Sequence, residues 1–239
     1  MSDVIASGHL ADERSAARLP AGMLGAQPQV LLLDFDGVIV DSVKLKVDAY
    51  LTIYADESPE KLAAVLDYQR HHAGETRRVK FRHFEAALFW RPVTHESIEA
   101  LSREYTRLVH DAVLQCALIP GAGEFLDAAR DAATMHVVSG TPHEELTDIV
   151  LRRGLAPYFA SLHGAPATKP AAFRELATAA GVPRERMLAI GDGTTEFDAA
   201  AALGIPFLGV VPPDEPSPFP AHVPVVASLA GLATALGYA

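Results

Sequence analysis

Short runs of apolar residues alternate along the chain with longer stretches in which apolar residues recur at helical spacing. Several runs are apolar at every position, which is typical of strands buried on both faces. The expected strands are Val30–Leu33, Met135–Val138, Ala160–His163, Leu188–Ile190 and Pro206–Val211, with Val223–Val226 as a sixth. Helical stretches such as Ala171–Ala180 and Glu196–Leu203 lie between them. Strands separated by helices predict an α/β fold with a parallel sheet covered on both faces.

One interval breaks this alternation. From about Ser42 to Ile119 the sequence contains no convincing strand and is charged and helical in pattern. We therefore expect residues 42–119 to form a helical domain inserted into an α/β core made of residues 29–41 and 120–239. Residues 1–28 are expected to form a loose N-terminal extension. A chain of 239 residues suffices for one sizeable core and a smaller inserted domain.

Composition argues against several classes of protein. The formal net charge of -10 argues against binding to nucleic acid or to a membrane surface. No apolar run approaches the roughly 18 residues of a membrane span. Cys116 is the only cysteine, so an intrachain disulfide is impossible and a reducing cytoplasm is the simplest compartment. The sequence leaves open whether the protein is a monomer or a homodimer.

Polar side chains follow the expected strands at the points where the strands end. Asp34 and Asp36 follow the first strand, Ser139 the second, Lys169 the third and Asp192 the fourth. Ligands of parallel α/β sheets bind at the carboxyl ends of the strands, so these groups are suited to one phosphate and one metal. Burying an unpaired carboxylate is costly or forces its protonation. The first pair therefore indicates a metal site or a nucleophile beside an acid/base, rather than a simple turn.

Four segments of the chain share this arrangement: residues 34–42 (DFDGVIVDS), 137–142 (VVSGTP), 169–170 (KP) and 191–196 (GDGTTE). Together they resemble the motifs of the haloacid dehalogenase-like hydrolase superfamily. The resemblance covers the chain from about residue 30 to residue 211. The insertion is similar to the helical cap of the β-phosphoglucomutase and phosphoglycolate phosphatase-like subgroup. The resemblance implies a Rossmann-like parallel sheet core with an inserted α-helical cap domain.

The resemblance also implies a role for each motif residue. Asp34 would attack phosphorus and form an aspartyl-phosphate, while Asp36 would protonate the leaving oxygen and later deprotonate water. The implied Mg²⁺ ligands are Asp34, Asp36 through its carbonyl, Asp192 and Glu196, and the implied phosphate-binding residues are Ser139, Gly140 and Lys169. The family usually has Asp where Glu196 stands. Asp198 is the alternative, but Glu196 keeps the family's register with the residues that follow.

A helix start is expected directly after the second motif. Thr141, Pro142 and Glu144 occupy the cap, first and third positions of a typical helix N-terminus. Ser139 would then lie near backbone N–H groups that favour an anion. Thr141 itself is expected to serve only as a cap.

The inserted segment contains a local reversal of charge. Residues 70–82 include five basic residues, with Glu75 as the only acid. Within them, residues 74–77 (GETR) are similar to the cap loop that meets the substrate in β-phosphoglucomutase-like proteins. The reversal predicts an anionic group on the substrate, with Arg77 and Lys80 as candidate contacts. A solvated helix face is the alternative interpretation.

These residues indicate a Mg²⁺-dependent phosphatase that acts on a small phosphorylated metabolite. A phosphomutase of the β-phosphoglucomutase type is the nearest alternative, because it uses the same pair of aspartates. A non-catalytic binding protein on this fold is a more distant one. Asp36 argues against dehalogenase and phosphonate hydrolase activity, since those members usually lack an acid/base at this position. The sequence contains neither a Walker P-loop nor a Gly-x-Ser-x-Gly motif.

Overall fold

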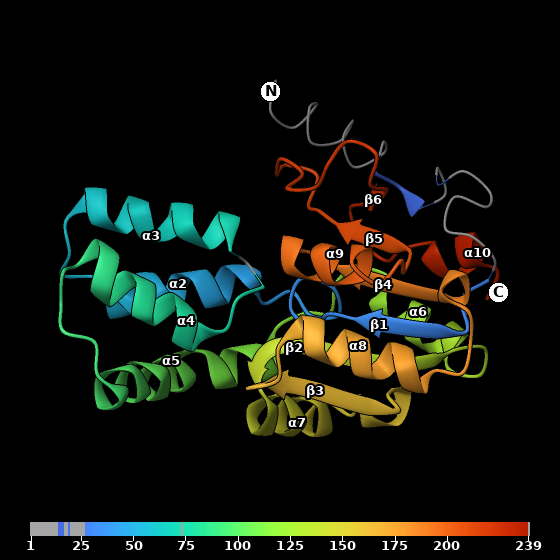
Figure 1. The fold of residues 1–239 in the computed structure, drawn as a ribbon, viewed down its shortest axis with the longest axis horizontal. Helices are drawn as coiled ribbons and strands as arrows, with labels where there is room; N and C mark the ends of the chain where they lie inside the picture. Colours follow the sequence, from blue (N-terminus) through green and yellow to red (C-terminus); the bar gives the residue numbers. More distant parts are fainter. Residues whose placement is uncertain (1–13, 17–18, 20–26, 73, 239) are drawn as a thin grey trace.

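A six-stranded parallel sheet forms the centre of the protein (Figure 1). The computed structural model describes residues 14–16, 19, 27–72 and 74–238. The strands are β1 (Val30–Leu33), β2 (Thr134–Pro142), β3 (Ser161–Ala165), β4 (Met187–Gly191), β5 (Phe207–Val210) and β6 (Val225–Val226). Their order is β3-β2-β1-β4-β5-β6. The predicted α/β fold is confirmed, although β2 continues to Pro142 instead of ending at Val138.

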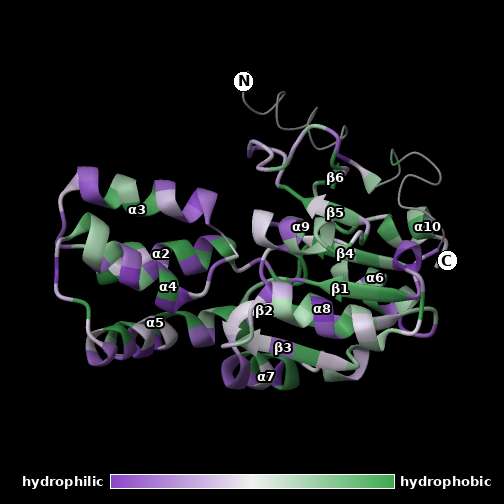
Figure 2. Cartoon of the chain, viewed as in Figure 1, coloured by the Kyte–Doolittle hydropathy of each residue, from purple (hydrophilic) through white to green (hydrophobic). Residues whose placement is uncertain are grey.

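Strand β1 shows why the sheet residues are apolar without interruption. It pairs with β2 on one side and with β4 on the other. Leu31 and Leu33 pack into one apolar cluster, whereas Val30 and Leu32 pack into a second one. Alternate side chains point to opposite faces of a sheet, so both faces of β1 are covered. Full burial of one such leucine contributes about 1.5–3 kcal/mol, and β1 and β4 are hydrophobic along their length in Figure 2.

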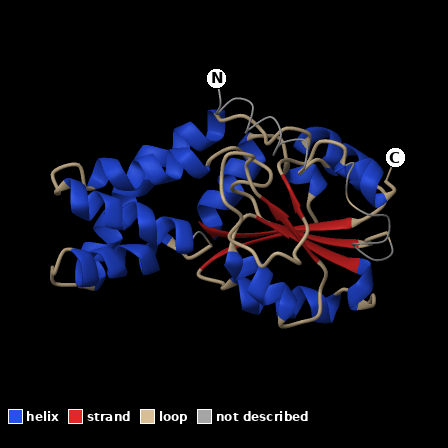
Figure 3. Ribbon diagram, turned by 90° about the horizontal axis from the view of Figure 1, so that it is seen from above, coloured by secondary structure: helices blue, strands red, loops and turns tan. Residues whose placement is uncertain are grey.

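Helices cover both faces of this sheet, as the view in Figure 3 shows. The first apolar cluster includes residues of α6 (Ala122–Ala129), α7 (His143–Arg152) and α10 (Leu232–Leu236). The second includes residues of α8 (Lys169–Ala179) and α9 (Thr194–Ala201). Short 3-10 helices at Ala156–Tyr158 and Arg184–Arg186 precede β3 and β4. This layering fixes the carboxyl ends of the strands, where the candidate residues lie.

A separate group of helices, called the cap here, lies between β1 and β2 in the sequence and beside the sheet in space (Figure 1). It contains α2 (Val43–Ile53), α3 (Pro59–His71), α4 (Arg77–His83), a π-helix (Phe84–Leu88) and α5 (His95–Gln115). Its centre is aromatic, with the Tyr50 ring 5.2 Å from that of Phe81 and 4.4 Å from that of Tyr105. No helix of the described chain is both long and apolar enough to cross a membrane.

The two linkers between the cap and the sheet are hydrogen-bonded to each other. Val40 and Leu118 form an antiparallel bridge. The amide of Asp41 donates to the carbonyl of Ala117, and the amide of Ile119 donates to the carbonyl of Ile39, each at 3.0 Å. The chain therefore leaves and re-enters the core at adjacent points. The cap boundaries at residues 42 and 119 stay a prediction, but the linkers lie beside them.

Part of the N-terminal extension packs against the core. The carbonyl of Arg14 accepts from the amide of Ala227 at 2.9 Å, and its guanidinium donates to the carbonyl of Val211 at 3.2 Å. Ala16 is buried. These residues are not loose, contrary to the expectation for this segment. Most of residues 1–26 lie outside the described chain.

Candidate active site

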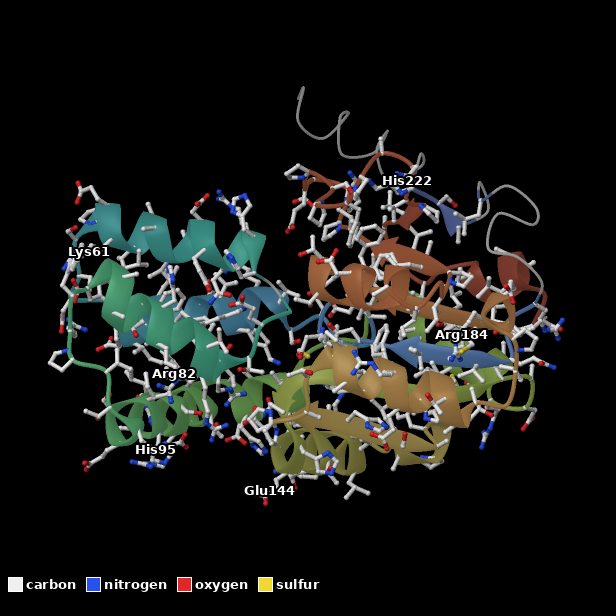
Figure 4. All side chains as sticks on the ribbon, viewed as in Figure 1. Lys61, Arg82, His95, Glu144, Arg184 and His222 are labelled. Carbon is white, nitrogen blue, oxygen red and sulfur yellow. The ribbon has the colours of Figure 1, made fainter. Side chains whose placement is uncertain are left out.

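Among the described residues, a partly open cavity of about 100 Å³ lies between the strand ends and the cap. Asp34, Asp36, Thr141, Lys169 and Asp192 line it from the core. On the cap side it is lined by Val43, Lys46, Val47, Tyr50, Gln69, Gly74, Glu75, Arg77, Lys80 and Tyr105. Side chains occupy the space between the two groups of helices in Figure 4. The carboxyl ends of the parallel strands thus place the predicted core residues together.

Asp34 is held rigidly at the end of β1. Its amide donates to the carbonyl of Ile190 at 2.9 Å, which continues the pairing of β1 with β4. Its Oδ1 accepts from the amide of Phe35 at 2.6 Å, and its Oδ2 accepts from Lys169 Nζ at 2.7 Å. Burial raises the pKa of Asp34, the Lys169 ammonium opposes this and the charge of Asp36 adds to it. Additional positive charge near Asp34 would therefore favour its ionised form.

Asp36 lies in a different electrostatic environment. Its Oδ1 accepts from Ser42 Oγ at 2.5 Å, and its Oδ2 accepts from Lys46 Nζ at 2.5 Å and from Thr141 Oγ1 at 3.1 Å. Burial alone would raise its pKa, but the Lys46 ammonium and these hydrogen bonds outweigh burial and lower the pKa. The two neighbouring carboxylates are thus shifted in opposite directions.

Three acidic side chains converge beside Asp34. One oxygen each of Asp34, Asp192 and Glu196 lies within 4.8 Å of the others. Lys169 contacts both Asp34 and Glu196. Burial and the charge of Asp34 raise the pKa of Asp192 to about 7, against the opposing effect of Lys169. One ammonium for three carboxylates leaves excess negative charge, and an all-oxygen donor set suits Mg²⁺.

The structure separates Glu196 from its alternative, Asp198. Glu196 is buried at the first turn of α9, whereas Asp198 is exposed on the same helix.

Gly37, in the first motif, lies directly against Asp192. It has a φ of +75°, and a Cβ there would lie 2.6 Å from Asp192 Oδ2. The glycine of the first motif is therefore required both by the turn and by the approach of Asp192.

The end of β2 differs from the sequence-based expectation. Helix α7 begins at His143 with Pro142 as its N-cap residue, so Thr141 is not its cap. The Thr141 hydroxyl instead donates to Asp36 and accepts from Lys46 Nζ at 2.8 Å. Ser139 is buried beside it, with its Oγ accepting from the Thr141 amide at 3.1 Å. The expectation that Thr141 serves only as a cap was wrong, because β2 extends far enough to turn its side chain toward Asp36.

Of the two predicted cap contacts, Arg77 is paired with the core. Its guanidinium donates to both carboxylate oxygens of Glu145 on α7, at 2.9 and 2.7 Å, and to Thr106 Oγ1 at 2.6 Å. It also lies 4.6 Å from the centre of the Tyr105 ring. The side chains of Arg77 and Glu145 are only 4% and 8% exposed. Arg77 lines the cavity, but its charge is already balanced.

Lys80, the second predicted cap contact, lies deeper in the cap. Its Nζ donates to Gln69 Oε1 at 2.7 Å, and both side chains are buried. Burial lowers the pKa of Lys80 to about 7, although the charge of Glu75 opposes this. Lys80, Gln69 and Glu75 thus form one polar group at the cap end of the cavity.

The cap loop closes directly over the core. A Cβ on Gly74 would lie 1.6 Å from Thr195 Oγ1 at the start of α9, so no larger residue fits this arrangement. A Cβ on Gly140, the third predicted phosphate-binding residue, would lie 3.4 Å from the carbonyl of Gly74. Gly74 therefore lets the cap backbone lie against the Thr195 side chain and near the Gly140 backbone of the core. Gly140 lines the cavity next to Thr141.

Sequence reasoning missed Lys46, Gln69 and the role of Glu75. For Lys46 a signal was present. Val43, Lys46, Val47 and Tyr50 occupy positions i, i+3, i+4 and i+7 of α2, so a lysine stands within a stripe of otherwise apolar or aromatic residues that line the cavity. A charge at such a position indicates a partner inside the fold. No comparable local signal distinguishes Gln69 from other residues of α3.

Comparisons with known proteins agree with this fold. A model of the haloacid dehalogenase-like hydrolase family matches residues 28–204. Enolase-phosphatase E1 of Frankia alni is 34% identical over 95 residues, which span 40% of this chain and only 38% of that enzyme. A protein described as a predicted phosphoglycolate phosphatase from Haemophilus somnus has a TM-score of 0.69 at 19% identity, covering 87% of this chain and 98% of its own. The HAD hydrolase YfnB of Bacillus subtilis, bound to magnesium, has a TM-score of 0.66 at 18% identity, covering 88% and 99%.

Proposed function

Because the chain belongs to the haloacid dehalogenase-like hydrolase family, we propose that it is a Mg²⁺-dependent phosphatase that releases phosphate from a small phosphorylated metabolite. The observation that carries this proposal is the placement of two carboxylates in one cavity, with Asp34 bound by Lys169 beside Asp192 and Glu196, and Asp36 bound by Lys46. The single cysteine supports a location in the reducing cytoplasm, and the net negative charge supports a protein that binds neither nucleic acid nor a membrane surface.

In the proposed reaction, an Asp34 carboxylate oxygen forms a bond to phosphorus while the bond from phosphorus to the ester oxygen breaks. Asp36 gives a proton to that leaving oxygen. It then takes a proton from the water that hydrolyses the aspartyl-phosphate, which frees Asp34 and inorganic phosphate. Ser139, Gly140 and Lys169 hold the phosphoryl oxygens, since phosphoryl transfer depends mainly on positioning and charge stabilisation.

The acidic group fits the metal that the family implies. Mg²⁺ would be held by Asp34, Asp192, Glu196 and the backbone carbonyl of Asp36. Its positive charge would offset the negative charge of the phosphate and of the carboxylates. The raised pKa of Asp192 supports this assignment, because a nearby cation would relieve the repulsion that causes it. YfnB, which is similar in fold, was solved with bound magnesium and reveals interdomain movement. Comparable movement of the cap about its paired linkers would admit the substrate.

The test is phosphate release from a panel of phosphorylated metabolites in the presence of Mg²⁺. Asp34→Asn should lower turnover by at least about 10³-fold, because it removes the nucleophile. Asp198→Asn is the matched control, since this aspartate is exposed on α9, and it should retain full activity. EDTA should stop turnover by the wild-type enzyme. Undiminished activity of Asp34→Asn would refute the nucleophile, and transfer of phosphate to a second hydroxyl without net release would favour the phosphomutase.

A further inference from the structure

Asp36 accepts hydrogen bonds from four side chains. Besides Ser42, Lys46 and Thr141, the Ser139 hydroxyl donates to its Oδ2 at 3.4 Å. An ionised carboxylate only accepts hydrogen bonds, and its two oxygens offer about four acceptor sites. The four donors therefore fit the ionised form of Asp36, which agrees with the lowered pKa described above. In this form Asp36 can act as a base, but it has no proton to give.

The first step of the proposed reaction nevertheless needs a proton. An alkoxide is a poor leaving group, so the ester oxygen of an alkyl phosphate must be protonated as its bond to phosphorus breaks. With a lowered pKa, Asp36 alone would carry a proton in only a small fraction of molecules at pH 7. The proton must therefore come from a group that contacts Asp36. Three of its four donors are hydroxyls, which are much weaker acids than the Lys46 ammonium.

Lys46 is placed to supply that proton. Its Nζ lies 2.5 Å from Asp36 Oδ2, the oxygen that also accepts from Ser139 of the proposed phosphate-binding group. The amide of Lys46 donates to the carbonyl of Ser42 at 3.0 Å, so both side chains lie on one face at the start of α2. The Tyr105 hydroxyl donates to the Lys46 carbonyl at 3.1 Å, and the Lys46 side chain is only 18% exposed. Its ammonium is therefore held beside Asp36 at the junction of cap and core.

We propose that Lys46 is the proton source for Asp36, so that the two residues act as one acid/base unit. This inference rests on the phosphatase function proposed above. As the ester bond to phosphorus breaks, a proton moves from Lys46 Nζ to Asp36 Oδ2 and from Asp36 to the leaving oxygen. The pair is left as a neutral amine and a carboxylate. When water attacks the aspartyl-phosphate, its proton passes through Asp36 back to Lys46, which restores the ammonium.

The substitution Lys46→Arg separates a proton source from a charge. It keeps a cation and hydrogen-bond donors beside Asp36, but a guanidinium does not release a proton in proteins. The measurement is kcat/KM for p-nitrophenyl phosphate and for the alkyl phosphate of the metabolite panel that is hydrolysed fastest. Lys46→Arg should lower the alkyl value by about 10²-fold and the aryl value by less than about threefold, because nitrophenolate departs without a proton. Lys44→Arg, at a position 82% exposed on the same helix, is the matched control and should change neither.

The variant Lys46→Met gives a second readout that does not depend on how well a guanidinium fits the site. Without the ammonium, Asp36 must carry its own proton, so kcat/KM for the alkyl ester should fall as the pH rises through the pKa of Asp36. The ratio of alkyl to aryl kcat/KM should therefore decrease from pH 6 to pH 8 in this variant and stay level in the wild type. The carboxyl ¹³C signal of Asp36, identified by its loss in Asp36→Asn, should be that of a carboxylate at pH 7 in the wild type.

Three results would each overturn the proton relay. They are undiminished alkyl activity of Lys46→Arg, a level ratio in Lys46→Met, and a protonated Asp36 at pH 7 in the wild type. Equal losses for both esters in Lys46→Arg, together with a level ratio in Lys46→Met, would mean that Lys46 only positions Asp36. Hydrolysis of aryl but not of alkyl phosphates by the wild type would refute the relay alone. Release of phosphate from no compound would refute the phosphatase function, and the relay with it.

Discussion

Removal of Glu145 should test whether its ion pair with Arg77 keeps the cap closed. The pair joins α4 of the cap to α7 of the core through two charge-assisted hydrogen bonds and is almost fully buried. Hydrogen bonds to charged groups contribute about 1.5–3 kcal/mol each, and loss of one partner of a buried pair costs about 3–5 kcal/mol. Thr106 still accepts one bond from Arg77, so we take the lower figure, about 3 kcal/mol.

The cost should appear in cap closure more than in global stability. An open cap lets water solvate Arg77, whereas a closed cap without Glu145 buries an uncompensated charge. A change of about 3 kcal/mol corresponds to roughly 100-fold in the closure equilibrium. Glu145→Leu should therefore lower kcat/KM by up to about 100-fold and increase hydrogen exchange in residues 74–80. The double variant with Arg77→Met should recover much of this loss, because it buries no charge.

A double-mutant cycle on kcat/KM measures the coupling between the two residues. Arg78→Met is the matched control, because Arg78 pairs with Glu99 within the cap and is 42% exposed, so its loss should cost less than about 1 kcal/mol. Additive effects of Arg77→Met and Glu145→Leu would refute the reasoning. In that case, a raised KM for Arg77→Met alone would mean that Arg77 contacts the substrate.

Two further predictions concern the pKa values of Asp192 and Asp36. The folded-state pKa of Asp192 is raised from its ordinary value to about 7, so metal-free protein should lose stability as pH rises through this range. Thermal melts in EDTA should show a higher Tm at pH 5.5 than at pH 7.5, Mg²⁺ should raise Tm more at pH 7.5, and Asp192→Asn should weaken both effects. Lys46→Met should raise the pKa of Asp36 and move the corresponding limb of the pH–rate profile to higher pH, whereas Lys44→Met, at an exposed position, should not. An unmoved profile would argue against Asp36 as the acid/base.

The sheet and its catalytic edge were predictable because their determinants are local in the sequence. A strand buried on both faces must be apolar throughout, and the side chains that follow parallel strands must meet at one edge. The order of strands therefore predicted that Lys169 and Asp34 lie at the same edge, although the residues are 135 positions apart, and the structure shows that they are hydrogen-bonded. The interpretation of Glu196 depended on the family's register, and the structure buries this residue at the site.

The contributions of the cap were not predictable in the same way. Arg77 and Glu145 are separated by 68 positions and lie on helices whose relative placement no periodicity encodes. A cluster of arginines in the sequence suggests uncompensated positive charge, because the acidic residues that pair with them are not yet known. The end of β2 shows a related limit, since Thr141-Pro142 suits a helix cap and a strand end equally well by composition. Packing against β3, which pairs with Pro142, decides between them.

Because Val40 and Leu118 form a bridge, the whole cap could be removed or replaced as one unit. Because the chain departs and returns through two adjacent hydrogen-bonded segments, a short turn could join them without altering the register of any strand. Such a truncated protein would retain Asp34, Asp192 and Lys169 on an intact sheet, with the acidic site open to solvent. Grafting another cap onto the same junction would then change which molecules are admitted while leaving the chemistry in place.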